Sequence, residues 1–159
     1  MLSKLTMLLA IYWVPVEVVK TSTWPLNGLH RELDNIAGLE SQYGKYLNHR
    51  AHPLGDFHTA FGSLGLKPST AHWMYMRTLK LQRQFPGLQD EQVFLKALWS
   101  NRELYTQCAN THWLFLRTAT PTLSRAVYAW RWGLTASNTA TDAKINDDAY
   151  VTKYAELAT

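Results

Sequence analysis

The feature that most limits the possible folds is the spacing of apolar residues, which recur every three or four positions along much of the chain. The clearest case is residues 102–117, where this spacing predicts a helix with one buried face. The same reasoning predicts helices at residues 29–39, 69–85, 90–99, 123–132 and 149–157. Residues 134–148 are expected to form a surface loop, and a small β element is expected only between residues 46 and 60. The sequence therefore predicts a mainly α fold.

Length and composition predict one globular domain after a short apolar segment. The 159 residues are 47% hydrophobic and 18% charged, which suits a single domain with a sizeable core. We place this domain at residues 21–159. In residues 1–20, Lys4 precedes an apolar run that is too short for a membrane span, which needs about 20 residues. A packed helix, an anchor in contact with a membrane and an export signal all remain open for this segment.

The candidate catalytic residue is Glu40, at the end of the first predicted helix. Leu33 and Ile36 precede it at helical spacing, so its carboxyl continues a stripe that should face the core. Burial disfavours the charged form of a carboxyl and raises its pKa, so a buried glutamate can hold a proton near neutral pH and donate it. A helix-terminal glutamate that points to solvent is the alternative.

Three short segments follow Glu40-Ser41 in a suggestive order. Residues 60–71 read AFGSLGLKPSTA, a glycine-punctuated turn that enters a helix near Pro68; residues 129–133 read AWRWG, and residues 150–154 read YVTKY. Together these segments resemble the motifs of the soluble lytic transglycosylase family. In that family a run similar to A-x-G-x-x-Q-x-x-P-x-T-A follows a catalytic E-S pair, and an A-Y-N-A-G turn and a closing Y-V-x-K segment come later.

The resemblance implies a single lysozyme-like, transglycosylase-type domain that needs no cofactor. Glu40 would be its general acid and base. Substrate binding would involve residues beside the acid, in the glycine-rich turn and near the end of the helix predicted at residues 123–132. These residues are Ser41, Gly62, Ser63, Gly65, Tyr128, Trp130 and Arg131. The chain departs from the family pattern at Gly65, where glutamine is usual, and at Trp130 and Arg131, where tyrosine and asparagine are usual.

The resemblance also implies the reaction. Glu40 would protonate the β-1,4 bond between N-acetylmuramic acid and N-acetylglucosamine in peptidoglycan, and would then take a proton from the muramic acid 6-hydroxyl as a 1,6-anhydro ring closes. A hydrolytic, lysozyme-type outcome would require a second carboxylate or a held water, for which Asp56 is the nearby candidate. The departures also favour an alternative, a catalytically weak or inactive lysozyme-like component of a virion or cell-envelope apparatus.

The segment around residues 48–59 contains three histidines, His49, His52 and His58. Imidazole is a common zinc ligand, so a metal-dependent hydrolase is a third hypothesis. The spacing matches no established zinc motif, and we expect no metal. The preferred interpretation is a loop along a glycan groove, in which Asp56 and His58 contact sugar hydroxyls or orient Glu40.

Charge and aromatic content fit a polymer-binding protein. The net charge of +4 favours anionic partners, and seven Trp and eight Tyr offer flat surfaces on which sugar rings can stack. No long basic block or nucleic-acid-binding signature occurs, so nucleic acid is not expected. The expected partners are peptidoglycan strands and other virion or envelope proteins, and the expected location is a phage virion or the host periplasm and cell envelope. The lone Cys108 excludes an intrachain disulfide and suits a buried position.

Overall fold

The computed structural model describes residues 24–45 and 57–159, and in these ranges the chain is mainly helical, as the sequence predicts. The apolar segment 1–20 and nearly all of the region predicted to hold a β element lie outside the described residues. The helices are α2 (Glu32–Ser41), α3 (Pro68–Arg77), α4 (Leu79–Gln84), α5 (Glu91–Ser100), α6 (Arg102–Ala119), α7 (Leu123–Trp132), α8 (Leu134–Thr139), α9 (Asp142–Asn146) and α10 (Ala149–Leu157). Within the described ranges, no helix is long and apolar enough to cross a membrane.

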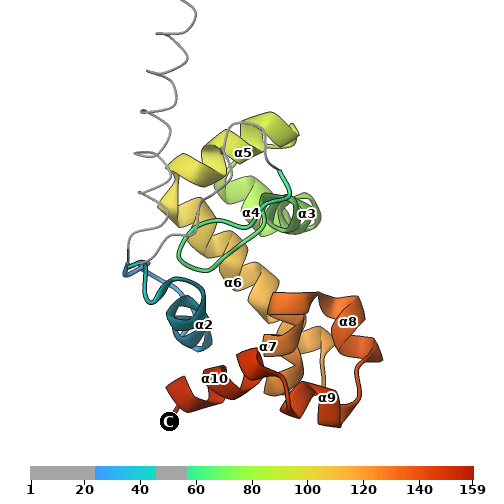
Figure 1. The fold of residues 1–159 in the computed structure, drawn as a ribbon. Coiled ribbons are helices and arrows are strands. Elements are labelled where there is room, and N and C mark those ends of the chain that lie inside the picture. Colours follow the sequence, from blue (N-terminus) through green and yellow to red (C-terminus); the bar gives the residue numbers. More distant parts are fainter. Residues whose placement is uncertain (1–23, 46–56) are drawn as a thin grey trace, which may run out of the picture.

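The long helix α6 is the centre of the fold. The Asn101 side chain accepts a hydrogen bond from the Leu104 backbone N–H and so caps its first turn. Its apolar face is buried along the whole length, from Leu104 to Leu116, and includes Cys108. In Figure 1, α3, α4 and α5 lie toward the start of α6, whereas α7 to α10 gather around its end. This arrangement leaves α6 as the floor between two groups of helices.

Glu32 links the start of helix α2 to both α6 and α10. The Glu32 carboxylate accepts a hydrogen bond from Trp113 Nε1 at 3.2 Å and pairs with Arg117 Nε at 3.1 Å, both from α6. Its backbone carbonyl accepts a hydrogen bond of 2.9 Å from the Tyr154 hydroxyl of α10. The start of α2 is therefore fixed between α6 and α10, and the residues at its other end take a defined position.

The predicted helix over residues 69–85 is wrong in its middle, because it divides into α3 and α4. The backbone of Thr78 is extended, with φ −119° and ψ 101°. The Gln82 side chain donates hydrogen bonds to the carbonyls of Tyr75 and Met76, both at 3.0 Å. These side-chain bonds satisfy carbonyls that lose helical partners at the break. The apolar spacing continues across the break, which explains why the pattern alone did not reveal it.

The predicted surface loop over residues 134–148 is also wrong, since it contains α8 and α9. The cause is Arg125 of α7, whose guanidinium donates hydrogen bonds to the carbonyls of Ser137 and Ala140 and pairs with Asp142 at 2.7 Å. The buried Ser137 hydroxyl in turn donates to the Arg125 carbonyl at 2.9 Å. Tertiary contacts from a neighbouring helix therefore stabilise short helices in a segment whose own sequence shows little helical periodicity.

Candidate active site

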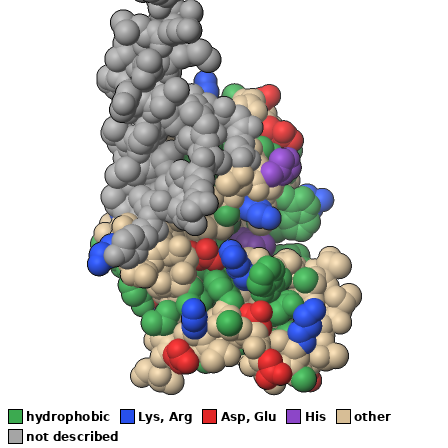
Figure 2. Space-filling view, in the orientation of Figure 1, with side chains coloured by type: hydrophobic (Ala, Val, Ile, Leu, Met, Phe, Trp, Pro, Cys, Tyr) green, Lys and Arg blue, Asp and Glu red, His purple; other side chains and the backbone are tan. Residues whose placement is uncertain are grey.

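A cleft of about 280 Å³ opens between the two groups of helices, above α6. Its walls come from the end of α2, the turn at residues 61–66, the start of α3 and the end of α7, and residues of α6 form the floor. Figure 2 shows a hollow across this face in which acidic, basic, histidine and hydrophobic side chains meet. The chain thus brings segments that are far apart in sequence to one concave, chemically mixed site.

Glu40 lies in this cleft, in the last turn of α2, as the helical stripe predicted. Leu33 and Ile36 on the same stripe are fully buried, and the Glu40 side chain is half-buried at the edge of that core. Burial raises the pKa of Glu40 above its usual range, while a hydrogen bond from Tyr150 and the charge of Arg131 act in the opposite direction. The net effect is a raised pKa, which suits a group that must carry and release a proton.

Tyr150 orients this carboxyl. Its hydroxyl donates a hydrogen bond to Glu40 Oε1 at 2.8 Å. Burial and the neighbouring carboxyl raise the pKa of Tyr150, so the hydroxyl keeps its proton and remains a donor. Asp148 caps α10 by accepting hydrogen bonds from the backbone N–H groups of Tyr150 and Val151, which fixes the start of that helix. The sequence analysis did not include Tyr150 among the site residues, although the YVTKY segment marked its position.

Gly65 borders the other oxygen of the carboxyl. Its backbone is left-handed, with φ +60°, and a Cβ atom built there would lie 2.7 Å from Glu40 Oε2. A side chain at this position is therefore excluded while Glu40 keeps its place. This contact gives a physical reason for glycine where the resembled family usually has glutamine. One oxygen of Glu40 is held by Tyr150, and the second faces a position without a side chain.

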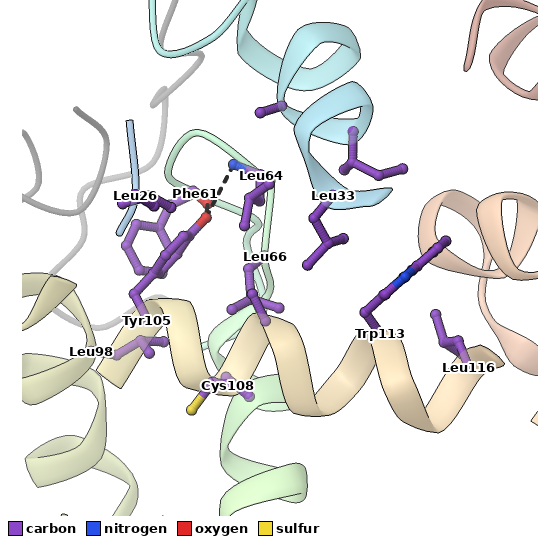
Figure 3. Close-up of a cluster of buried hydrophobic side chains, with 14 of the residues drawn as sticks. Leu26, Leu33, Phe61, Leu64, Leu66, Leu98, Tyr105, Cys108, Trp113 and Leu116 are labelled. Atoms are coloured by element: carbon purple, nitrogen blue, oxygen red, sulfur yellow. Dashed lines mark hydrogen bonds between the residues drawn. The ribbon is translucent and has the colours of Figure 1, made fainter. Parts of the chain in front are cut away.

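The turn that carries Gly65 is held from below by α6. Phe61 and Leu66 form an isolated antiparallel bridge with backbone hydrogen bonds of 3.1 and 3.0 Å. The buried Tyr105 hydroxyl donates to the Phe61 carbonyl at 2.8 Å and accepts from the Leu64 N–H at 3.2 Å (Figure 3). Figure 3 also shows Leu66 packed between this turn and α6. These contacts fix the position of Gly65 relative to the Glu40 carboxyl.

Ser41 of α2 was predicted to bind substrate, and so were Gly62 and Ser63 of the turn, but these three residues lie behind the cleft. The buried Ser41 hydroxyl donates to the carbonyls of Ala37 and Ser63 and accepts from the Gly44 N–H. Ser63 is fully buried, and a Cβ at Gly62 would collide with the Tyr105 hydroxyl. These residues do not line the cleft. Their contacts instead connect α2 to the turn, so they position Glu40 relative to Gly65.

At the end of α7, two of the three predicted substrate-binding residues lie in the cleft wall. Trp130 and Arg131 line the cleft, whereas Tyr128 is buried beneath it and packs against the Trp132 ring. Trp130 is half-buried, and its Nε1 donates to the Leu64 carbonyl at 3.1 Å, so it helps hold the turn. The exposed ring on this wall belongs to Trp132, which the sequence analysis did not select.

Of the two candidates from the histidine-rich segment, only His58 falls within the described residues. Asp56 lies outside the described residues, and so do His49 and His52. His58 is exposed and does not line the cleft. Among the residues that the structure describes, no group of three or more His, Cys, Asp or Glu side chains could hold a metal ion. The zinc hypothesis gains no support from the part of the segment that can be placed.

His112 of α6 is a cleft residue that the sequence did not reveal. Its ring lies 5.2 Å from the Trp130 ring, and burial lowers its pKa to about 4, so the imidazole is neutral at physiological pH. In the described part of the chain its buried Nδ1 has no hydrogen-bond partner. A histidine within a helical repeat has no distinguishing sequence signal, which explains why it was missed.

No protein-family model matches the sequence, and no curated protein or solved structure matches the chain. The interpretation of the cleft therefore rests on its own geometry and on the short motifs.

Proposed function

We propose that the protein is a peptidoglycan lytic transglycosylase that cleaves the bond between N-acetylmuramic acid and N-acetylglucosamine. The observation that carries the proposal is the state of Glu40, a half-buried carboxyl with a raised pKa in a cleft. Tyr150 holds one of its oxygens at 2.8 Å, and the other faces Gly65. This arrangement suits a general acid, because the carboxyl has a fixed orientation and lines the cleft.

In the proposed reaction, protonated Glu40 donates its proton through Oε2 to the glycosidic oxygen. The bond from the muramic acid C1 to that oxygen breaks, the N-acetylglucosamine leaves with a free 4-hydroxyl, and positive charge develops on the muramic acid ring. The 6-hydroxyl oxygen of the same sugar then bonds to C1. Glu40, now a carboxylate, accepts the 6-hydroxyl proton, so the enzyme returns to its initial state and the product carries a 1,6-anhydro ring.

The acidic groups of the cleft favour this route over a two-carboxylate hydrolase. Of the described residues that line the cleft, Glu40 is the only acid, and the charged neighbours are Lys67 and Arg131. Hydrolytic glycosidases commonly use a second carboxylate, about 5–5.5 Å away in retaining enzymes or about 6.5–9.5 Å away in inverting ones. A single carboxyl that acts first as acid and then as base suits the chemistry in which the substrate supplies the nucleophile.

The second candidate is a lysozyme-like virion or envelope component that binds glycan without cleaving it. Its support is the altered surroundings of the acid. Position 65 has no side chain, and the Trp130 indole is used to hold the Leu64 carbonyl. The residues that assist the acid in the resembled family are therefore replaced, while the acid itself is present.

The two candidates are separated by mass spectrometry of purified peptidoglycan after incubation with the wild-type chain and with Glu40→Gln. We expect anhydro-muropeptides from the wild type and none from the variant. Glu156→Gln makes the same chemical change on the exposed side of α10 and serves as the matched control, with products unchanged. Reducing-end products would indicate hydrolysis instead. Binding to intact walls without any product would overturn the enzyme and support the structural candidate.

A further inference from the structure

The tryptophan at the α3 end of the cleft has no role in the site described so far. Trp73 is 41% exposed, which is high for so large an apolar side chain. It follows Thr70, a cleft residue, by one helical turn, and this spacing advances about 4.5 Å along α3. Its ring lies 5.5 Å from that of Phe115, and Phe115 also lines the cleft. The aromatic surface is therefore continuous with the cleft.

Arg77 adds hydrogen-bond donors to this surface. Its guanidinium carbon lies 4.0 Å from the centroid of the Trp73 ring, within the range of a cation–π contact. Among the residues that can be placed, no carboxylate forms an ion pair with Arg77. A flat apolar ring beside an exposed guanidinium matches a pyranose, which has an apolar face of C–H groups and hydroxyls or a carboxylate around its edge.

A similar pair occurs on the opposite wall. Trp132 at the end of α7 is 53% exposed, lines the cleft, and has the Arg131 guanidinium 5.3 Å from its ring centroid. Its Nε1 donates to Asp148 at 3.2 Å, which limits rotation of the indole. Figure 1 shows α3 beside α6 toward its start and α7 at the end of α6. A polymer in the cleft would therefore meet one tryptophan–arginine pair on each wall.

We propose that Trp73, Phe115 and Arg77 form a glycan subsite that binds a sugar ring away from the scissile bond. This sugar belongs to the same glycan strand that contacts Trp132. The inference rests on the proposed function for the identity of the polymer. It adds that affinity depends on chain length, because only a strand longer than the reacting disaccharide reaches both walls. The Trp73 subsite contributes binding energy that a disaccharide cannot use.

The test measures binding of soluble N-acetylglucosamine oligosaccharides by isothermal titration calorimetry, with the full chain. For the wild type we expect the hexasaccharide to bind more tightly than the disaccharide. Trp73→Ala should weaken hexasaccharide binding roughly five- to tenfold and leave disaccharide binding within about twofold. Trp73→Phe, which keeps a flat ring, should retain most of the affinity. Leu79→Ala removes an apolar side chain that is more exposed than Trp73 and lies outside the cleft, and should have no effect.

Equal hexasaccharide affinity in Trp73→Ala and wild type would overturn the subsite, and so would equal losses for short and long ligands or no binding by the wild type. A protein partner at Trp73 instead of a sugar would give the first of these results. The outcome is separable from the reaction. Length-dependent binding through Trp73 without anhydro products would retain the subsite and remove the enzyme, whereas products with no dependence on Trp73 would do the reverse.

Discussion

Two tyrosine hydroxyls form hydrogen bonds in different surroundings, one on the fully buried Tyr105 and one on the half-buried Tyr150. The Tyr105 hydroxyl bonds two backbone groups of the turn at residues 61–66, and the Tyr150 hydroxyl bonds the Glu40 carboxyl. Burial raises the pKa of both phenols, so both act as neutral groups. The partners of Tyr105 never change charge, whereas the partner of Tyr150 gains and loses a proton. The first region should therefore contribute mainly to stability and the second mainly to chemistry.

The largest effect is expected from a substitution of Glu40, the carboxyl to which Tyr150 donates its hydrogen bond. Glu40→Gln keeps the size and hydrogen-bonding capacity of the side chain but cannot donate or accept the catalytic proton. We expect the rate of muropeptide release to fall by about 10²- to 10⁴-fold, the usual contribution of a general acid or base. Circular dichroism should show an unchanged fold. A rate near that of the wild type would contradict the role of Glu40.

The next effect breaks the Tyr105 region. Tyr105→Phe leaves the buried Leu64 N–H without its partner, and we expect the free energy of unfolding in urea to fall by about 1–3 kcal/mol. Tyr150→Phe is the matched variant, and it should lose less because its partner Glu40 can hold a proton. If the two substitutions destabilise the protein equally, the distinction between the regions fails.

A substitution at Gly65 tests the point where the two regions meet. Gly65→Ala forces a side chain into a left-handed backbone and against Glu40 Oε2, so we expect a stability loss of about 1–2 kcal/mol and a rate loss of about ten- to a hundredfold. Gly87 has a similar backbone, with φ +81°, and open space around it. Gly87→Ala should show the stability loss alone. Equal rates in the two folded variants would refute a role of Gly65 beside the acid.

A smaller effect sharpens the comparison through pH. The hydrogen bond from Tyr150 favours the charged form of Glu40 and so lowers its pKa; removing this bond should raise it further. In Tyr150→Phe the acid then keeps its proton to higher pH, and the alkaline limb of the rate–pH profile moves upward, with a rate loss of several-fold from poorer orientation. Tyr105→Phe should leave the limb in place. A downward movement in Tyr150→Phe would show that the bond acts in the opposite sense.

The smallest effect concerns stability and pH. A carboxyl whose pKa is raised in the folded state binds protons more tightly there than in the unfolded chain, so stability decreases as pH rises from the unfolded pKa to the folded one. Glu40→Gln removes this decrease. Its stability relative to the wild type should therefore increase between about pH 4 and neutrality. Thermal unfolding over this pH range measures the difference in stability. A constant difference would mean that burial does not raise the pKa of Glu40.

The sequence alone predicted the helical class and the boundaries of the most periodic helices. The end of α7 at Trp132 and the start of α6 at Arg102 are as expected, because amphipathic spacing and caps act locally. The same local reasoning placed Glu40 on the buried stripe of α2. It failed at Thr78, where the Gln82 side chain of α4 bonds the carbonyls at the break. It also failed over residues 134–148, where the Arg125 side chain of α7 bonds the backbone.

What the sequence by itself determined is thus the most periodic helices, their buried faces and one carboxyl at the edge of the core. The tertiary structure alone decided that Tyr150, 110 positions later, donates to that carboxyl, that Gly65 lies against it and that His112 forms part of the floor. It also decided that Ser41 is structural and that Trp132, not Trp130, is the exposed ring. The reason is that periodicity specifies which face of a helix is buried, whereas the packing of distant helices specifies which side chains meet.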